Sequence, residues 1–288
     1  MAVQPLIGDL AITAANAYSF SIWKLGVALP VHESTSAQTV GRAVNLLRLV
    51  ASNQLRHLRL VDIAAMASLD KSTAHRLLQR LVQERMLARD AARGYRLGPL
   101  LYELGLVALP ETNLREVSQA ALSDLAHATG DMVFLIVRSG FETVCLNRIA
   151  GNFPIQTMTR SVGDRHPLGV GAGGLAILSA LGDPDVKIAV KAVAPQLSRY
   201  GLTEDLLHER VAATRKRGHA VDEGSAALDV TALGRPVHDR SRSPIAAVFV
   251  ASIRSRMTPG RQREMDKRIA TCVKAVEGAL PHASPQGE

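Results

Sequence analysis

The chain has 288 residues, of which 47% are hydrophobic and 21% charged, so it can build a buried core and is not a disordered protein. Its length fits two domains better than one or three. Thirty-four Lys and Arg against 26 Asp and Glu give a net charge of +8 and a pI near 9.9, which favours a polyanionic partner such as nucleic acid. The sequence contains no run of about 18 uncharged apolar residues, the length that a transmembrane helix needs, so we expect no membrane partner.

The cysteines and histidines argue against a metal site and against catalysis. Cys145 and Cys272 lie far apart, without a CxxC motif or a histidine at ligand spacing, and we interpret them as reduced, partly buried thiols of a cytoplasmic protein. The nine histidines are dispersed, and neither GxSxG nor HExxH occurs. We therefore predict a protein that is not an enzyme, with no catalytic residue, metal or cofactor.

The positive charge is concentrated in one part of the chain. Residues 1–38 have one Lys against one Asp and one Glu and no basic signal-peptide region, and we expect a poorly ordered extension there. Residues 39–110 hold eleven Lys and Arg against five Asp and Glu, a net charge of +6, whereas residues 111–288 hold a net +3. This clustering predicts a nucleic-acid-binding surface in the first quarter of the folded part.

Residues 39–98 contain three helical patterns. The first covers residues 40–53, the second 60–67 and the third 70–84, where Asp70 offers a side-chain cap. In the first two helices the predicted inward residues are Val40, Ala43, Val44, Leu47 and Val50, and then Ile63, Ala64 and Ala67. In the third helix they are Ala74, Leu77, Leu78, Leu81 and Val82, one continuous stripe.

The opposite face of the third helix is polar and basic. Beginning at Lys71, it carries Ser72, Thr73, Arg76, Gln79, Arg80 and Gln83, with His75 at its border. Arg can read guanine and Gln adenine in a major groove. Residues 86–90 and 94–97 predict a β-hairpin in which Gly94 supplies turn freedom. The pattern predicts a winged helix-turn-helix whose Arg93 and Arg96 reach the DNA backbone or the minor groove, although a solvated face without function remains an alternative.

These residues carry a family resemblance. KSTAHRLL at Lys71–Leu78 and GYRLG at Gly94–Gly98 resemble the DNA-binding motif of the IclR family of bacterial transcription regulators. Further matches, in the family's order and spacing, are Arg42-Ala43, Val162-Gly163, Pro167-Leu168, Arg215 to Gly218, Asp222 and Pro244 to Ala247. The chain departs from the family at Ser68, where a turn Gly is usual, and at Asp70, where Pro often opens the helix; both residues still permit a turn and a cap.

The resemblance covers residues 39–280 and implies both an architecture and partners. It implies a winged helix-turn-helix at 39–98, a linker helix at 99–112, and an effector-binding domain with a GAF-like α/β (α+β) fold at 113–282, followed by a tail at 283–288. Family members bind DNA as dimers or tetramers and sense small organic acids or aromatic catabolites. We therefore expect a homodimer or homotetramer, a palindromic double-stranded DNA operator and a small organic acid effector.

The linker and the second domain have their own patterns. The linker has an apolar stripe, too hydrophobic for a lone exposed helix, that a second copy would cover: Leu100, Leu101, Leu104, Val107 and Ala108. In the second domain, helices are predicted at residues 114–129, 173–181, 185–193, 203–217 and 258–280. Strands are predicted at 132–137, 143–149 and 245–252.

A glycine-rich segment precedes the predicted helix at 173–181. Gly169, Gly171 and Gly174 satisfy GxGxxG, but residues 164–167 stand where a strand should be and no βαβ unit follows, so we do not expect a dinucleotide site. Glycine-freed N–H groups at a helix start can instead hold a carboxylate. In the family, amides of this segment face the effector, and the matching positions are Ala172 and Gly173.

The resemblance also implies side-chain contacts to the effector. Carried over one at a time, they are Met158, Asp222, Val230, Ala232, Phe249 and Ala251. Where small-acid sensors have one Cys and two Ser, this chain has Ala232, Phe249 and Ala251, so hydrogen-bonding groups are replaced by apolar ones. We expect a carboxylate with an apolar or aromatic body rather than glyoxylate.

Two alternatives stay open at this stage. Phe249 can point into the core instead of the pocket, because a period of two cannot be phased from sequence. The chain can also be a small-molecule-binding or enzymatic α/β domain with a basic module that binds RNA or protein. Few aromatic residues in the basic module argue against RNA, since base stacking needs them.

Overall fold

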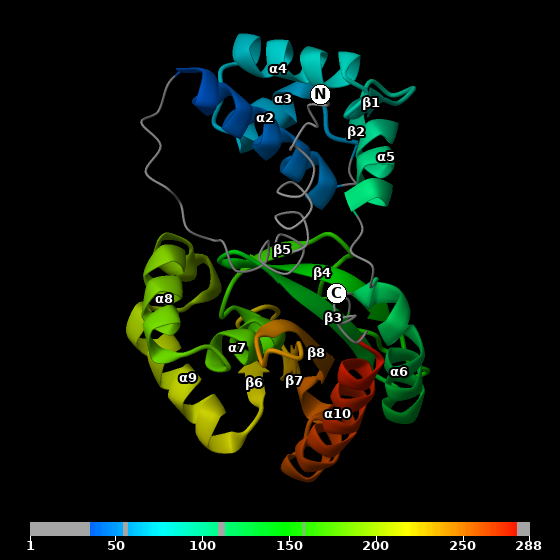
Figure 1. Cartoon of the computed structure of the whole chain (residues 1–288), viewed down its shortest axis with the longest axis vertical. Coiled ribbons are helices and arrows are strands. Elements are labelled where there is room, and N and C mark those ends of the chain that lie inside the picture. Colours follow the sequence, from blue (N-terminus) through cyan, green and yellow to red (C-terminus); the bar gives the residue numbers. More distant parts are fainter. Residues whose placement is uncertain (1–34, 54–56, 109–112, 158, 281–288) are drawn as a thin grey trace, which may run out of the picture. The chain divides into compact units, whose positions relative to one another are not determined.

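The computed structural model describes residues 35–53, 57–108, 113–157 and 159–280 (Figure 1). The described residues belong to two compact units, 35–108 and 113–280, which we treat separately. Most of the expected extension, the end of the linker and the tail lie outside the described residues. Within the described ranges, no helix combines the length and apolar character needed to cross a bilayer.

The N-terminal unit is a winged helix-turn-helix, as predicted. Its elements are α2 (Thr35–Ser52), α3 (Leu60–Met66), α4 (Lys71–Gln83), β1 (Leu87–Arg89), β2 (Tyr95–Leu97) and α5 (Pro99–Ala108). The predicted cap of α4 is confirmed, because the Thr73 N–H donates to Asp70 Oδ1 at 2.8 Å. Hydrogen bonds from Ser72 and Thr73 also hold the pKa of the Asp70 carboxyl below its usual range.

The core of this unit confirms one predicted stripe and corrects another. On α4, Ala74, Leu78 and Leu81 are buried as expected. On α2, Val50 is buried as predicted, but Val40 and Val44 are 65% and 40% exposed, and Leu46, which was not predicted, is buried. The correction has a tertiary cause, because the face of α2 that carries Leu46 and Val50 packs in one cluster with Ile63 and Leu78, and Val40 and Val44 do not belong to this cluster.

Two turns of this unit contain left-handed residues. Ser68 has φ +53°, a conformation that glycine adopts without strain, which explains why the family usually has Gly there. In the wing, where Gly94 was expected to supply the freedom of the turn, the left-handed residue is Arg93, at φ +62°. Gly94 supplies space instead: its N–H donates to Asp90 Oδ1 at 2.7 Å, and a Cβ on Gly94 would lie 2.8 Å from Asp90 Oδ2.

The C-terminal unit is built on an antiparallel sheet of six strands. In spatial order they are β5 (Arg165–Pro167), β4 (Glu142–Ile149), β3 (Met132–Ser139), β8 (Pro244–Ile253), β7 (Val230–His238) and β6 (Ala220–Glu223). The sequence patterns did not predict β6 or β7. The short strand β5 also corrects our expectation for residues 164–167: it pairs with β4 in antiparallel fashion and therefore opens no parallel βαβ unit.

Helices cover both faces of this sheet (Figure 1). They are α6 (Leu114–Thr129), α7 (Gly171–Ser179), α8 (Asp183–Leu197), α9 (Glu204–Arg217) and α10 (Pro259–Ala279). Phe134, Ile136 and Phe249 pack with residues of α7, α8 and α9, whereas Val133 and Val248 pack with α6 and α10. The register of β8 therefore places Phe249 on the face that α7 covers.

Candidate functional site

Helix α4 exposes one polar face, and its opposite face is anchored in the core. Lys71, Ser72, Arg76, Gln79 and Arg80 are exposed, with Thr73 and His75 half-buried at the border, and Arg93 and Arg96 are exposed on the wing. On the opposite face Leu78 is fully buried. The helix is thus fixed by its apolar side and displays cations and amides to the outside, as entry into a major groove requires.

The exposed arginines differ in what they contact. Arg80 Nη2 lies 2.5 Å from Glu84 Oε1, and Arg89 Nη2 donates to the Tyr95 hydroxyl at 2.6 Å. Arg76, Arg93 and Arg96 make no ion pair within 4 Å in the described part of the chain. Within the described residues, Arg76 is thus not held by an ion pair, whereas Arg80 is paired with Glu84. Sequence reasoning missed Arg89, whose guanidinium carbon lies 5.0 Å from the Tyr95 ring centroid.

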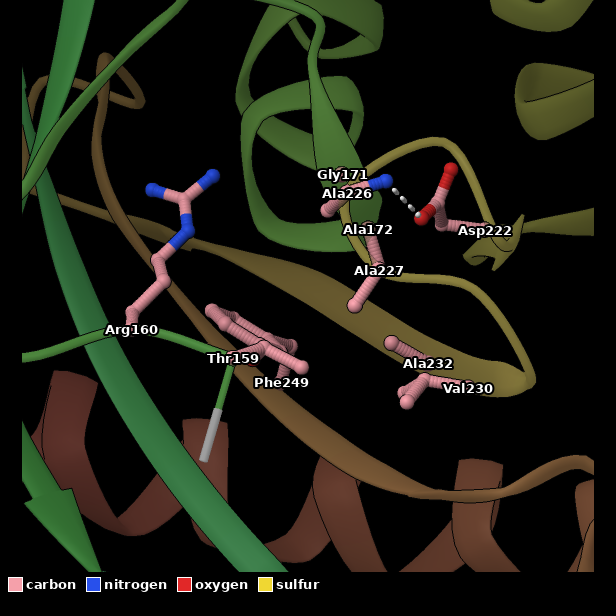
Figure 2. Close-up of a pocket in the computed structure, with 10 residues that line it drawn as sticks. All are labelled: Thr159, Arg160, Gly171, Ala172, Asp222, Ala226, Ala227, Val230, Ala232 and Phe249. Carbon is pink, nitrogen blue, oxygen red and sulfur yellow. Dashed lines mark hydrogen bonds between the residues drawn. The ribbon is translucent and has the colours of Figure 1, made fainter. Parts of the chain in front are cut away.

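The C-terminal unit contains a pocket between the start of α7 and the sheet (Figure 2). The cavity itself is small, about 10 Å³, so a ligand of more than a few atoms requires the lining side chains to move. It is lined by Thr159, Arg160, Gly171, Ala172, Asp222, Ala226, Ala227, Val230, Ala232 and Phe249. Apart from Arg160 and Asp222, the lining side chains are apolar or small, which suits a small ligand with one charged group.

The structure brings together most of the effector residues inferred from the sequence. Ala172, Asp222, Val230, Ala232 and Phe249 line the pocket. Gly173 and Ala251 do not belong to its lining. At Gly173 an added Cβ would lie 2.7 Å from Ile136 Cδ1, and Ala251 is 1% exposed in the sheet, so both residues are enclosed by packing. Met158 lies outside the described residues.

Phe249 belongs to both the core and the pocket. Its ring stacks on Phe134 with centroids 4.7 Å apart and planes 9° apart, and it is 4% exposed. The Arg160 guanidinium carbon lies 5.9 Å from the Phe249 ring centroid. Because one ring serves both environments, the two alternatives left open by the sequence are each correct in part.

The start of α7 lies at the pocket, and its first two residues belong to the lining. Gly171 and Ala172 occupy its first turn, and the preceding cap residue, Val170, has no side-chain acceptor. Gly169 and Gly171 have φ values of +95° and +71°, so these glycines allow the chain to turn sharply just before and at the start of α7. This arrangement supplies the positive end of a helix dipole on one side of the pocket.

Asp222 holds the connection between β6 and β7 over the pocket. Its Oδ1 accepts from Arg210 Nη2 at 2.6 Å and from the Ser225 hydroxyl, and its Oδ2 accepts from the Ala226 N–H at 3.3 Å (Figure 2). The Asp222 side chain is 4% exposed. Arg210 therefore balances the charge of Asp222, and the Asp222 carboxylate fixes the position of Ala226 relative to the sheet by a hydrogen bond.

Sequence reasoning missed the buried cation of the pocket. Arg160 is 3% exposed, and it donates to Thr143 Oγ1 at 3.1 Å and to the Val170 carbonyl oxygen at 3.2 Å. Burial lowers the pKa of Arg160 to about 10, so the side chain is still charged at neutral pH. It follows a segment without regular secondary structure, so no periodic pattern could have identified it.

Comparison with known proteins identifies two domains of one family. The IclR helix-turn-helix domain matches residues 39–91, and the bacterial transcriptional regulator IclR C-terminal domain matches residues 106–277. The chain belongs to the IclR family. This IclR-family protein is a DNA-binding transcriptional regulator, not an enzyme, and the helix-turn-helix match covers all of α4.

Curated relatives and solved structures agree with this assignment. The glycerol operon regulatory protein of Streptomyces coelicolor is 31% identical over 247 residues, covering 84% of this chain and 96% of the relative. The transcriptional repressor IclR of Escherichia coli is 25% identical over 244 residues, covering 83% and 88%. An IclR homolog from Microbacterium hydrocarbonoxydans, crystallised with 4-hydroxybenzoate, has the same fold at a TM-score of 0.66 and 21% identity, covering 84% of this chain and 98% of that one.

Proposed function

We propose that this IclR-family regulator reads a palindromic operator through α4 and the wing, and that a small carboxylate with an apolar or aromatic body controls its binding to DNA. The observation that carries the DNA-binding part is the two-sided character of α4. Leu78 is fully buried on one side, and Arg76 is exposed and without an ion pair within the described ranges on the other. Such a helix can enter a major groove without losing its place in the core.

The DNA-binding proposal is tested by Arg76→Ala. A lost base contact costs about 1 to 3 kcal/mol, so selective operator binding should fall about tenfold or more in a gel shift while circular dichroism stays unchanged. Arg80→Ala should have a similar effect, reduced by the energy that Arg80 needs to leave Glu84. Arg263→Ala, which removes an exposed charge on α10, is the control. Unchanged discrimination between operator and random DNA in both α4 variants would exclude this recognition face.

Exposed apolar residues support the proposed oligomer. In the single chain, Tyr102, Leu104, Leu106 and Val107 on α5 are 71%, 50%, 52% and 88% exposed. Monomeric soluble proteins rarely leave such a patch uncovered, and a second copy would bury it. Light scattering should therefore show at least a dimer at micromolar concentration, and footprinting should show two half-sites. A monomer that protects one half-site would contradict the proposal.

The lining of the pocket supports an apolar or aromatic carboxylate as effector. The N–H groups of the first turn of α7 can hold the anionic end, while Val230, Ala232 and Phe249 surround the rest. The complex of the Microbacterium hydrocarbonoxydans homolog with 4-hydroxybenzoate supports the same ligand class. Calorimetry should show tighter binding of 4-hydroxybenzoate or benzoate than of glyoxylate or pyruvate. Tighter binding of pyruvate would contradict the proposed ligand class.

A further inference from the structure

We propose that Arg160 is the specificity-determining anchor of the pocket and selects a carboxylate anion over its neutral isostere. This inference rests on the proposed function of the pocket and adds a side chain that recognises the charge of the ligand. Backbone N–H groups can bind a neutral carbonyl as well as a carboxylate, whereas a guanidinium distinguishes the two by charge.

Arg160 is a buried cation that forms no direct ion pair with any residue in the described ranges. Both of its described hydrogen bonds go to neutral acceptors, the Thr143 hydroxyl and the Val170 carbonyl oxygen. Among the residues that the structure describes, no carboxylate oxygen lies within 4 Å of its nitrogens. A guanidinium that is 3% exposed and unpaired carries a desolvation cost, which a bound carboxylate would offset.

The nearby acidic side chains already have other partners. Asp222 accepts from Arg210 at 2.6 Å and holds the β6–β7 connection. Asp164 Oδ2 accepts from the Ser161 N–H at 2.6 Å. The neighbouring Cys145 thiol is neutral, because burial raises its pKa to about 11. Asp164 and Asp222 act on Arg160 only over a distance, because neither forms an ion pair with it within 4 Å, so the guanidinium can still accept a bound carboxylate.

The position of Arg160 fits a ligand that reaches both α7 and Phe249. Its Nη2 lies 3.2 Å from the carbonyl oxygen of Val170, the cap residue of α7, and 3.3 Å from the place where a Cβ on Gly171 would stand. Figure 2 shows Arg160 and Asp222 on opposite sides of the pocket, with apolar side chains between them. A carboxylate held by Arg160 can also meet the N–H groups of α7, while its apolar body lies toward Phe249.

The test compares benzoate with benzamide, which has nearly the same shape but no charge. Wild-type protein should bind benzoate about 10- to 150-fold more tightly in calorimetry, the range expected for a hydrogen bond to a charged group. Arg160→Met should remove most of this preference, leaving the smaller part that the α7 dipole supplies, with the affinity for benzamide nearly unchanged. Arg160→Lys, which keeps the charge, should retain part of the preference. Arg263→Met controls for the loss of one positive charge.

Thermal unfolding without ligand separates an anchor from a structural residue. If Arg160 is an anchor, Arg160→Met removes an unbalanced buried charge, and the variant should melt no lower than the wild type. Arg160→Gln, which retains a hydrogen-bond donor, serves as the second variant. Two results would overturn the proposal that Arg160 is an anchor. In the first, both variants unfold well below the wild type and still prefer benzoate. In the second, the wild type does not distinguish benzoate from benzamide at millimolar concentration. Operator binding is measured separately, without ligand, so the result for Arg160 neither supports nor contradicts the DNA-binding proposal.

Discussion

The two units differ in whether their unpaired arginines are exposed or buried. In the N-terminal unit, Arg76, Arg93 and Arg96 are exposed to water and make no ion pair within the described residues. In the C-terminal unit, Arg160 is almost fully buried, and burial lowers its pKa. An exposed cation costs the fold little and suits a polyanion that is bound through many contacts. A buried cation costs desolvation energy and suits one small anion that enters the same buried site.

The largest expected effect is at the aromatic side of the pocket. Because the Phe249 ring is buried and stacked on Phe134, Phe249→Ala should lower the free energy of unfolding by about 3 to 5 kcal/mol in urea. Phe141→Ala, which truncates a partly buried ring packed against the same core, should cost clearly less. Equal losses would show that the interior around the pocket is less tightly packed than the stacking implies.

A pH effect on stability should distinguish the C-terminal unit. Burial and, after it, the charge of Arg160 lower the pKa of His166 to about 3. The unfolded chain, with an ordinary histidine pKa near 6.5, binds a proton before the folded chain does, so stability falls as pH drops below about 6.5. Between pH 7 and pH 5 this loss should be on the order of 2 kcal/mol. Urea unfolding of His166→Gln should show a smaller loss, and an unchanged pH dependence would contradict this origin.

A smaller, local effect is expected at the N-terminus of α4. Asp70→Ala removes the acceptor for the Thr73 N–H, so the first turn should fray and the melting temperature should fall by a few degrees. Hydrogen exchange of the Thr73 amide measures the fraying directly. Asp70→Asn keeps a capping oxygen and should restore most of the protection. Equal exchange in the two variants would show that the cap does not depend on this side chain.

The smallest stability effects should come from the exposed arginines. Arg76→Ala, Arg93→Ala and Arg96→Ala should each change the free energy of unfolding by less than about 0.5 kcal/mol. If Arg96 contacts a phosphate, its loss should reduce the slope of log affinity against log salt by about one. A stability loss of more than about 1 kcal/mol in any of these variants would show that the exposed charges support the fold. The two units would then not differ in the way described above.

Much of the N-terminal unit could be predicted because its signals are local. The period of α4, its cap at Asp70 and the spacing of the hairpin each involve residues close together in the chain. The errors came where distant contacts decide. The sequence pattern placed Val40 and Val44 inside and missed the buried Leu46, and it assigned the freedom of the wing turn to Gly94, whereas the left-handed residue there is Arg93.

In the C-terminal unit the sequence, through its family resemblance, indicated half of the residues that line the pocket and not how the pocket is built. The resemblance indicated Ala172, Asp222 and Phe249, and the structure brings them together. The tertiary structure decided that β6 and β7 complete the sheet and that Phe249 faces α7, because strand pairing and phase depend on residues far apart in the chain. The tertiary structure also decided that Arg160 is buried, because its segment has no periodic pattern from which burial could be predicted. The packing of α7 and β8 encloses the Arg160 side chain.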